Sequence, residues 1–389
     1  MLNTCTVTNQ ADADSRKYIR RAIRNNPNAF IAVMGCYSQL KPDEVKKIHG
    51  VDLILGTNNK FDITKFINGI KKNEVPEVFI PDLKDAPFHF ASSVDNDSRT
   101  RIVFKIQDGC DYVCTYCTIP KARGKSRSMD FNALKSRLIE MNNSDYSEIV
   151  LSGINLGEYH SPTGEKFVDV LKFIASNKLN YRVRISSIEP NLVTDEIIKI
   201  VKNSENICNH FHIPLQSGSD EILKAMKRRY ITKKYAEKIE KIKKQIPDCC
   251  IGADVIEGFP LETNYNFEET YNFINDLPIS YLHVFTYSER EGTPAAQIKN
   301  QLPVNLRKER TIRLRKLSEK KRIEFINSQI GKIKTIIPET IYLKNGNIVL
   351  KGLTDNYITT ELYTNTEIKG FLKAKIIDRK GEIAIAVLA

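Results

Sequence analysis

The chain has 389 residues, of which 41% are hydrophobic and 27% are charged, and its mean hydropathy is −0.34. This composition is typical of a soluble protein with two or three domains, and no apolar run approaches the ~20 residues that cross a bilayer. The net charge of +12 and the isoelectric point near 9.1 favour a polyanionic partner, nucleic acid first. The N-terminus shows no secretion signal, so the eight cysteines indicate metal-binding or redox thiols and a cytoplasmic location.

Helical and strand-like patterns alternate over the first seventy residues and predict an α/β domain over 1–70. Residues 71–99 are rich in Pro and Asp and lack periodicity, so they predict a linker. The elements predicted before the linker are helices over 11–26 and 41–50 and buried strands over 29–36 and 51–57.

From residue 101 to about residue 286, strand and helix patterns alternate six times. Six βα units in series imply a parallel sheet, and their regular spacing favours an open or partial barrel. In such architectures the chemistry lies at the carboxyl ends of the strands. The predicted strands are 101–107, 148–153, 182–188, 209–215, 250–256 and 281–287, and the predicted helices are 130–142, 167–177, 194–203, 219–227, 232–245 and 266–276.

The C-terminal part changes character twice. Residues 305–334 carry eleven Lys or Arg against three Glu, with apolar residues at helical spacing. They predict a helix whose basic face is either solvated or in contact with RNA. The residues after it form short strand patterns separated by Gly and Asn turns, which predicts a small all-β barrel, a shape that often binds nucleic acid.

Three cysteines, Cys110, Cys114 and Cys117, follow the first strand of the six-unit region. A closed structural zinc site needs four ligands, and no second CxxC follows these three. Three thiolates instead suit a [4Fe–4S] cube that keeps one iron open for an exogenous chelating ligand. The spacing alone leaves a zinc site as the alternative.

The CxxxCxxC spacing resembles the signature of the radical S-adenosylmethionine (SAM) superfamily. This resemblance implies that the amino and carboxylate groups of SAM chelate the open iron, and that one electron from the cluster yields a 5′-deoxyadenosyl radical. Tyr116, before the last cysteine, matches a family position near the adenine.

Further segments resemble one enzyme family within that superfamily. "NTCTVT" and "VMGCYSQ" are similar to the N-terminal domain of the methylthiotransferases, and the C-terminal strands resemble their TRAM domain. Four segments resemble the tRNA threonylcarbamoyladenosine branch of that family, namely "SSIEP" (186–190), "HFHIPLQSGSDEILKAMKRRY" (210–230), "GADVIEGFP" (252–260) and "HVFTYSEREGTPA" (283–295). "GFPLET" departs from the family pattern, because Leu261 stands where a glycine is usual.

The resemblance implies a two-cluster enzyme. A second [4Fe–4S] cluster would carry the inserted sulfur, and of its three cysteines the chain offers Cys5 and Cys36. The third ligand is absent from this chain, so we expect that the true start codon lies upstream. One SAM molecule would supply the methyl group and another the radical.

The resemblance also suggests residues for the cofactor and the substrate. Gly153 and Asn155 follow the second strand of the region, where the family meets the methionine amino group. Ser187, Glu189 and Gln216 follow the third and fourth strands and are candidates for ribose or methionine contacts.

Two arginines are candidates for the substrate. Arg123 and Arg127 suit the carboxylate of a threonylcarbamoyl group or a phosphate, because a guanidinium binds either bidentately. His210 and His212 alternate along a strand, and a satisfied core histidine is favoured over a metal pair.

The predicted fold is therefore a partial (β/α)6 radical SAM barrel over 100–328, preceded by an incomplete α/β domain and followed by a TRAM-like barrel over 329–389. The implied reaction is methylthiolation of C2 of N6-threonylcarbamoyladenosine at tRNA position 37. Implied partners are the tRNA anticodon stem-loop and a reductant such as flavodoxin or ferredoxin, with no membrane and no DNA. Two alternatives share the chemistry, with isopentenyladenosine or a ribosomal-protein aspartate as substrate. A third alternative is an inert tRNA-binding paralogue.

Overall fold

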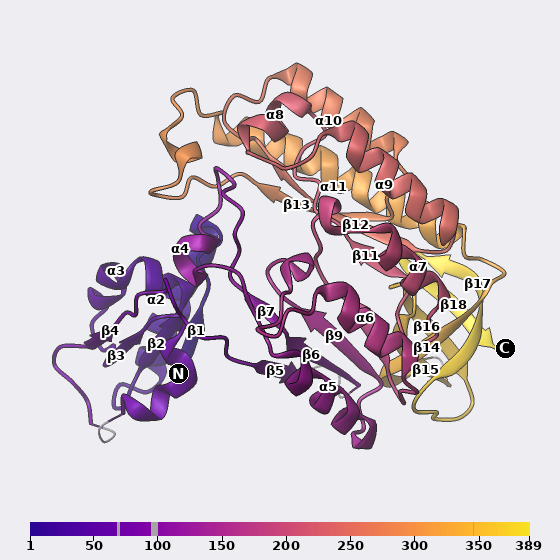
Figure 1. The fold of residues 1–389 in the computed structure, drawn as a ribbon, viewed down its shortest axis with the longest axis horizontal. Helices are drawn as coiled ribbons and strands as arrows, with labels where there is room; N and C mark the ends of the chain where they lie inside the picture. The colour runs from indigo at the N-terminus through magenta and orange to yellow at the C-terminus, as the bar shows by residue number, and fades with distance from the viewer. Residues whose placement is uncertain (68–70, 95–99, 345) are drawn as a thin grey trace. The chain divides into compact units, whose positions relative to one another are not determined.

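The computed structural model describes residues 1–67, 71–94, 100–344 and 346–389 (Figure 1). Parts of the predicted N-terminal domain (68–70), linker (95–99) and C-terminal domain (345) lie outside these described residues. The chain divides into two compact units. The first unit comprises 1–89, 108–127 and 288–298, and the second comprises 90–107, 128–287 and 299–389. Segments 108–127 and 288–298, which fall in the predicted core at 100–328, thus pack with the N-terminal residues.

The first unit contains a parallel sheet of order β1-β2-β3-β4 (Figure 1). Its longest helix starts where the Thr8 side chain accepts a hydrogen bond from the Ala11 amide, as an N-cap does. Ile19 of that helix packs on Val33 and Ile54 in the core. The elements of this unit are β1 (Leu2–Thr4), α1 (Asn9–Asn25), β2 (Ala32–Gly35), α2 (Cys36–Leu40), α3 (Pro42–Lys46), β3 (Leu53–Leu55), η1 (Asn59–Lys65), β4 (Glu77–Phe79), α4 (Ile119–Arg123) and η5 (Pro294–Gln297).

The segment expected to be a linker, 71–99, contributes two strands. β4 pairs in parallel with β3, and β5 (Ala91–Val94) pairs antiparallel with β6 (Arg101–Lys105) of the second unit. The linker prediction misses β4 because all three of its residues are exposed, so this strand carries no burial pattern.

In the second unit, the six predicted strands and their helices are present. β6, β9 (Glu148–Ser152) and β10 (Arg182–Ile185) pair in parallel, and so do β11 (His210–His212), β12 (Cys250–Glu257) and β13 (Tyr281–Thr286). Parallel bridges from Val183 to Ile207 and from Ser187 to His212 join the two sets. The helical segments between the strands are α5 (Phe131–Glu140), η2 (Met141–Asn143), η3 (Leu156–Glu158), α6 (Phe167–Ser176), η4 (Pro190–Leu192), α7 (Asp195–Asn203), α8 (Asp220–Ala225), α9 (Thr232–Gln245) and α10 (Asn264–Asp276).

The basic segment forms α11 (Val304–Asn327), which packs along β13 and α10 (Figure 1). Three of its cations are buried instead of lying on a solvated face, namely Arg307, Arg310 and Lys321. Arg310 pairs with Glu262, and the Lys321 ammonium donates to the carbonyls of Asn275 and Leu277. Part of the positive charge of this helix therefore serves contacts inside the fold.

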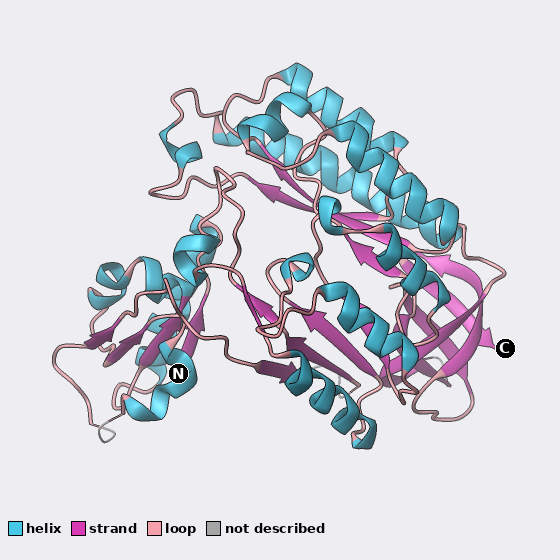
Figure 2. Cartoon of the chain, in the orientation of Figure 1, coloured by secondary structure: helices cyan, strands magenta, loops and turns pink. Residues whose placement is uncertain are grey.

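After α11, every regular element among the described residues is a strand (Figure 2). These strands form a closed barrel of order β14-β15-β16-β18-β17. Their bounds are β14 (Ile333–Lys344), β15 (Asn347–Thr354), β16 (Thr359–Thr364), β17 (Leu372–Lys380) and β18 (Ile383–Leu388). No helix in the described ranges is both long enough and apolar enough to span a membrane.

A buried ion cluster joins this barrel to the parallel strands. Glu148, at the start of β9, pairs with Arg182 and Arg184 of β10 at 2.6 and 2.8 Å. The guanidinium of Arg182 also donates to the carbonyls of Thr335 and Leu353, and that of Arg184 donates to two further barrel carbonyls. All three charged side chains are buried.

Candidate active site

The cysteine loop begins in the first unit, at Asp108 of the short strand β7 (Gln107–Asp108), which pairs with β8 (Arg127–Ser128). Gly109 has a φ of +73°, and a Cβ there would lie 1.9 Å from the carbonyl oxygen of Lys125. Only glycine fits such a left-handed position at this close approach. The Cys110 amide donates to the Gly124 carbonyl at 3.2 Å, which fixes the start of the loop.

Backbone amides point at the sulfurs of this loop. The Tyr112 amide donates to Cys110 Sγ and the Ile119 amide to Cys117 Sγ, each at 3.4 Å. Cys114 is buried, whereas Cys110 and Cys117 are half-buried. Hydrogen bonds to sulfur and limited solvent access are two means by which proteins tune iron–sulfur clusters. The donor set therefore fits a three-thiolate cluster.

Cys36 lies at the start of α2, after a glycine with a φ of +106°. Arg123, at the end of α4, donates from Nε to Cys36 Sγ at 3.2 Å and pairs with Asp108 Oδ1 at 3.2 Å. Burial lowers the pKa of Arg123, but the nearby Cys36 and Asp108 outweigh this effect and raise it overall. Cys5 is exposed at the end of β1.

Arg127 lies beside the same carboxylate. Its Nη2 is 3.6 Å from Asp108 Oδ2, and its other nitrogens donate to the carbonyls of Pro87, Arg123 and Lys125. Both predicted substrate arginines thus contact a carboxylate of the chain itself. Their role towards a substrate stays a prediction.

A cavity of about 330 Å³ opens beside this loop, within the first unit. Cys110 and Gly124 line it from the cysteine loop and α4, and Gln39 and Leu83 line it from the N-terminal part. Gln39 is held in place, because its amide bonds to the Pro81 carbonyl and to the Thr57 amide. One of the predicted cluster ligands therefore faces a cavity.

In the second unit, Gln107 positions the turn that carries Gly153 and Asn155. Its side-chain oxygen accepts from the amides of Ile154 and Asn155 at 2.8 and 3.0 Å. A Cβ on Gly153 would lie 2.7 Å from that oxygen. The Asn155 side chain in turn accepts from the Glu189 amide at 3.3 Å. Two of the predicted residues, Asn155 and Glu189, thus lie in one hydrogen-bonded network, and Gly153 lies directly beside it.

Two of the predicted SAM residues each have a buried polar atom that makes no hydrogen bond to the described part of the chain. These atoms are Nδ2 of Asn155 and Oε1 of Gln216. Gln216 also has a φ of +68°, a conformation that non-glycine residues rarely adopt. Buried polar atoms are nearly always hydrogen-bonded, so each of these atoms fits a bound polar ligand. The carboxylate of Glu189 is instead paired with Arg228. Ser187 bridges to His212 through its backbone.

Sequence reasoning missed Gln107, Asp108 and Arg228. Gln107 is the last residue of the predicted strand over 101–107, and Asp108 follows it. Their place at the carboxyl end of a strand was therefore an available signal. Arg228 lies 39 residues from its partner Glu189 and had no such signal. Tyr116, the predicted adenine contact, is half-buried in the cysteine loop.

Comparison with known families gives two matches. Residues 104–274 match the model of the radical SAM superfamily, and residues 1–56 match that of Uncharacterized protein family UPF0004. The first match contains all three cysteines of the loop, and the second contains Cys5 and Cys36.

Curated relatives match over nearly the full length. The chain is 39% identical over 383 residues to "Threonylcarbamoyladenosine tRNA methylthiotransferase MtaB" of Bacillus subtilis (strain 168), covering 97% of this chain and 85% of that protein. It is 30% identical over 387 residues to "tRNA-2-methylthio-N(6)-dimethylallyladenosine synthase" of Clostridium botulinum (strain Langeland / NCTC 10281 / Type F), covering 97% and 85%.

Among solved structures, the radical SAM methyltransferase TsrM from Kitasatospora setae, with cobalamin and a [4Fe–4S] cluster bound, has a similar fold. Its TM-score is 0.54 at 14% sequence identity, over 76% of this chain and 64% of that one. At this identity the likeness concerns the fold alone.

Proposed function

The chain belongs to the radical SAM family of tRNA methylthiotransferases, and from this premise we propose that it methylthiolates C2 of N6-threonylcarbamoyladenosine in tRNA. It is an enzyme that uses a [4Fe–4S] cluster and SAM. The observation that carries the proposal is the 39% identity to a threonylcarbamoyladenosine enzyme over 97% of the chain, against 30% to a dimethylallyladenosine enzyme.

Cys110, Cys114 and Cys117 hold the cluster in this proposal. When bound, the cluster supplies the electron that turns SAM into a radical source, which an unactivated aromatic C–H requires. The amides of Tyr112 and Ile119 stabilise negative charge on two of the ligand sulfurs. The burial of Cys114 limits access of water to the third.

SAM binds, in this proposal, beside the turn that Gln107 positions. Asn155 and Gln216 offer it their unsatisfied Nδ2 and Oε1 atoms, and Gly153 leaves room for the Gln107 side chain that positions the turn. Glu189 is a further proposed SAM contact, and its pair with Arg228 orients its carboxylate. Ser187 and Tyr116 complete the proposed cofactor contacts.

Cys5 and Cys36 are proposed ligands of a second cluster. The contact from Arg123 Nε to Cys36 Sγ supports this role, because hydrogen bonds to ligand sulfurs are one means by which proteins tune iron–sulfur clusters. The six parallel strands are proposed to form the partial (β/α)6 barrel, and strands β14–β18 the TRAM domain. The proposed partners are the anticodon stem-loop, with position 37 as target, and a flavodoxin- or ferredoxin-type reductant in the cytoplasm.

Nucleoside mass spectrometry tests the function. The gene is expressed in a bacterial strain that lacks its own tRNA methylthiotransferases, and total tRNA is digested and analysed. We expect 2-methylthio-threonylcarbamoyladenosine to appear with the wild-type protein and with Cys249→Ala, which removes a buried thiol. It should be absent with Cys114→Ala.

The other readings give different outcomes. In the same tRNA digest, a 2-methylthio derivative of isopentenyladenosine would appear in place of the threonylcarbamoyl product. For the protein substrate, mass spectrometry of the ribosomal proteins from the same strain would show a mass increase on an aspartate. An inert paralogue would bind tRNA with a steep salt dependence and release no 5′-deoxyadenosine from SAM under anaerobic reduction.

A further inference from the structure

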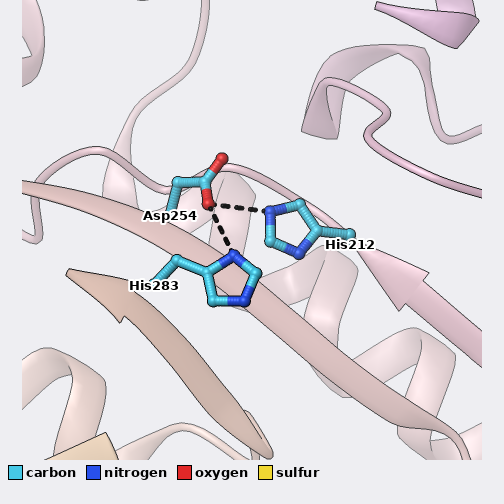
Figure 3. A group of neighbouring side chains, drawn as sticks. All are labelled: His212, Asp254 and His283. Carbon is cyan, nitrogen blue, oxygen red and sulfur yellow. Dashed lines mark ion pairs between the residues drawn. The ribbon is translucent and has the colours of Figure 1, made fainter. Parts of the chain in front are cut away.

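Three polar side chains meet on one face of the β11-β12-β13 sheet, outside the residues assigned above. They are His212 of β11, Asp254 of β12 and His283 of β13, and Figure 3 shows both imidazoles pointing at the carboxylate. Asp254 Oδ1 is 2.9 Å from His212 Nε2 and 3.4 Å from His283 Nδ1. In the strand register Asp254 lies directly opposite His283.

The ligand atoms are spaced as around a metal ion. The three atoms lie within 4.8 Å of one another, and two of their separations are 2.9 and 3.4 Å. Zinc with bonds of about 2.0–2.1 Å to nitrogen and oxygen holds tetrahedral ligands about 3.3 Å apart. Two histidines and one carboxylate form a frequent ligand set for catalytic zinc and for non-haem iron.

The surroundings orient His212 as a ligand. Its other ring nitrogen, Nδ1, lies 3.4 Å from the hydroxyl of Tyr281, which also contacts His210 Nε2 at 3.0 Å. Such an outer partner on the second nitrogen is usual for a metal-binding histidine, because it fixes the ring and its tautomer. His210 itself is a buried core histidine whose pKa burial holds well below its usual range.

The exposure of the group also suits a cation. The His283 side chain is 53% exposed, whereas that of His212 is 11% exposed. One side of the group is therefore open, and a metal there keeps positions for water or another ligand.

We propose that His212, Asp254 and His283 form a binding site for a divalent first-row transition metal ion, of the two-histidine-one-carboxylate type. The site is independent of the three-cysteine loop, which lies in the other unit of the chain. It uses nitrogen and oxygen ligands, whereas the loop offers sulfur.

Zinc is the probe that tests the site. Anaerobically reconstituted protein, in which iron occupies the cysteine loop, is equilibrated with Zn²⁺ and freed of unbound metal, and zinc is counted by mass spectrometry. We expect one zinc ion per chain. X-ray absorption at the zinc edge should show ligands at about 2.0–2.1 Å and no sulfur at about 2.3 Å.

Variants assign the zinc to the three residues. Loss of an outer-shell partner lowers metal affinity about 10- to 100-fold, so loss of a ligand in His283→Ala or in the isosteric Asp254→Asn should cost at least as much. His49→Ala, at an exposed histidine of the first unit, should bind zinc as the wild type does. Unchanged iron content in each variant verifies the fold.

Three outcomes would overturn the proposal. They are the absence of stoichiometric zinc in the wild type, a zinc shell that contains sulfur, and equal zinc affinity in Asp254→Asn and His49→Ala.

Discussion

Replacing Glu148 with alanine removes a carboxylate that pairs with two buried arginines. Glu148 is completely buried, and its oxygens accept from Arg182 Nε at 2.6 Å and from Arg184 Nε and Nη2, both at 2.8 Å. In Glu148→Ala both guanidinium groups keep their bonds to barrel carbonyls but lose their counter-charge. Breaking a buried ion pair in this way costs about 3–5 kcal/mol, because an uncompensated charge stays inside the protein.

Native-state hydrogen exchange measures this loss where it acts. The Thr354 amide donates to the Ile358 carbonyl, and the Asp355 amide donates to the Thr335 carbonyl. The carbonyls of Thr354 and Asp355 themselves accept from Arg184, so these two amides report on the contact. A loss of 3–5 kcal/mol at about 1.36 kcal/mol per factor of ten predicts a roughly 150- to 5,000-fold faster exchange there. Glu196→Ala breaks an exposed pair with Lys172 and should leave this exchange unchanged. Equal exchange in the two variants would refute the view that Glu148 holds the arginines.

Four further predictions concern single positions. Gly109→Ala should abolish iron binding by the cysteine loop, measured as iron per chain, because its Cβ would collide with the Lys125 carbonyl oxygen. Leu261→Gly should raise the urea midpoint, because Leu261 is exposed and has a φ of +76°, a conformation that costs a non-glycine residue about 1–2 kcal/mol. Asn155→Ala should weaken SAM binding roughly 5- to 150-fold in equilibrium dialysis, the loss of about 1–3 kcal/mol for one hydrogen bond. Glu257→Gln should raise stability increasingly as the pH rises from 5 to 8.5, because burial and a nearby carboxylate hold the pKa of Glu257 well above its usual range.

The sign for Glu257 follows from proton linkage. Because the folded pKa is raised, the folded state keeps a proton above the unfolded pKa that the unfolded state has released, so the stability of the wild type falls as the pH rises towards the folded pKa. Glutamine carries no such proton. Parallel stability profiles of wild type and Glu257→Gln between pH 5 and 8.5 would contradict a raised pKa.

Matched variants control the predictions for Gly109 and Asn155. Gly164→Ala has a φ of +104° but nothing within 4 Å of its Cβ, so it should keep its iron, and iron loss there would point to general unfolding. Gln10→Ala, on the exposed face of α1, should bind SAM normally. If Leu261→Gly lowers the midpoint, the entropy of glycine in the unfolded chain outweighs the relief of strain.

The sequence was sufficient for elements with a strong local pattern. The predicted helix over 194–203 corresponds to α7 and the predicted strand over 250–256 to β12, because their apolar residues recur at the period of the element. β4 was missed because it buries none of its residues, so its sequence carries no burial pattern. It is held by pairing with β3 and by contacts of Phe79 with Phe66 and Asn59, which lie earlier in the chain.

The site was predictable only where its residues are close in sequence. The loop from Cys110 to Cys117 has its proposed ligands within one short segment. Arg123 was assigned to the substrate, whereas its nitrogen contacts Cys36, 87 residues away. His212, Asp254 and His283 come from three strands and share a face only through the strand register. Arg307 was expected on a basic face but is buried, where its guanidinium donates to the main-chain carbonyls of Leu302 and Tyr287.

The hydrogen bonds that Arg182 and Arg184 donate to the C-terminal barrel go to main-chain carbonyl oxygens at residues 335 and 353–355, which every amino acid possesses. Arg184 also lies over the ring of Tyr357, in the connection between β15 and β16, at 5.0 Å from the ring centroid. Substitutions on the barrel strands that preserve the backbone path therefore leave these hydrogen bonds intact. The barrel can diversify its outward side chains in evolution, or be exchanged in a chimaera for that of a relative that keeps an aromatic residue at 357, without compensating changes in the two arginines.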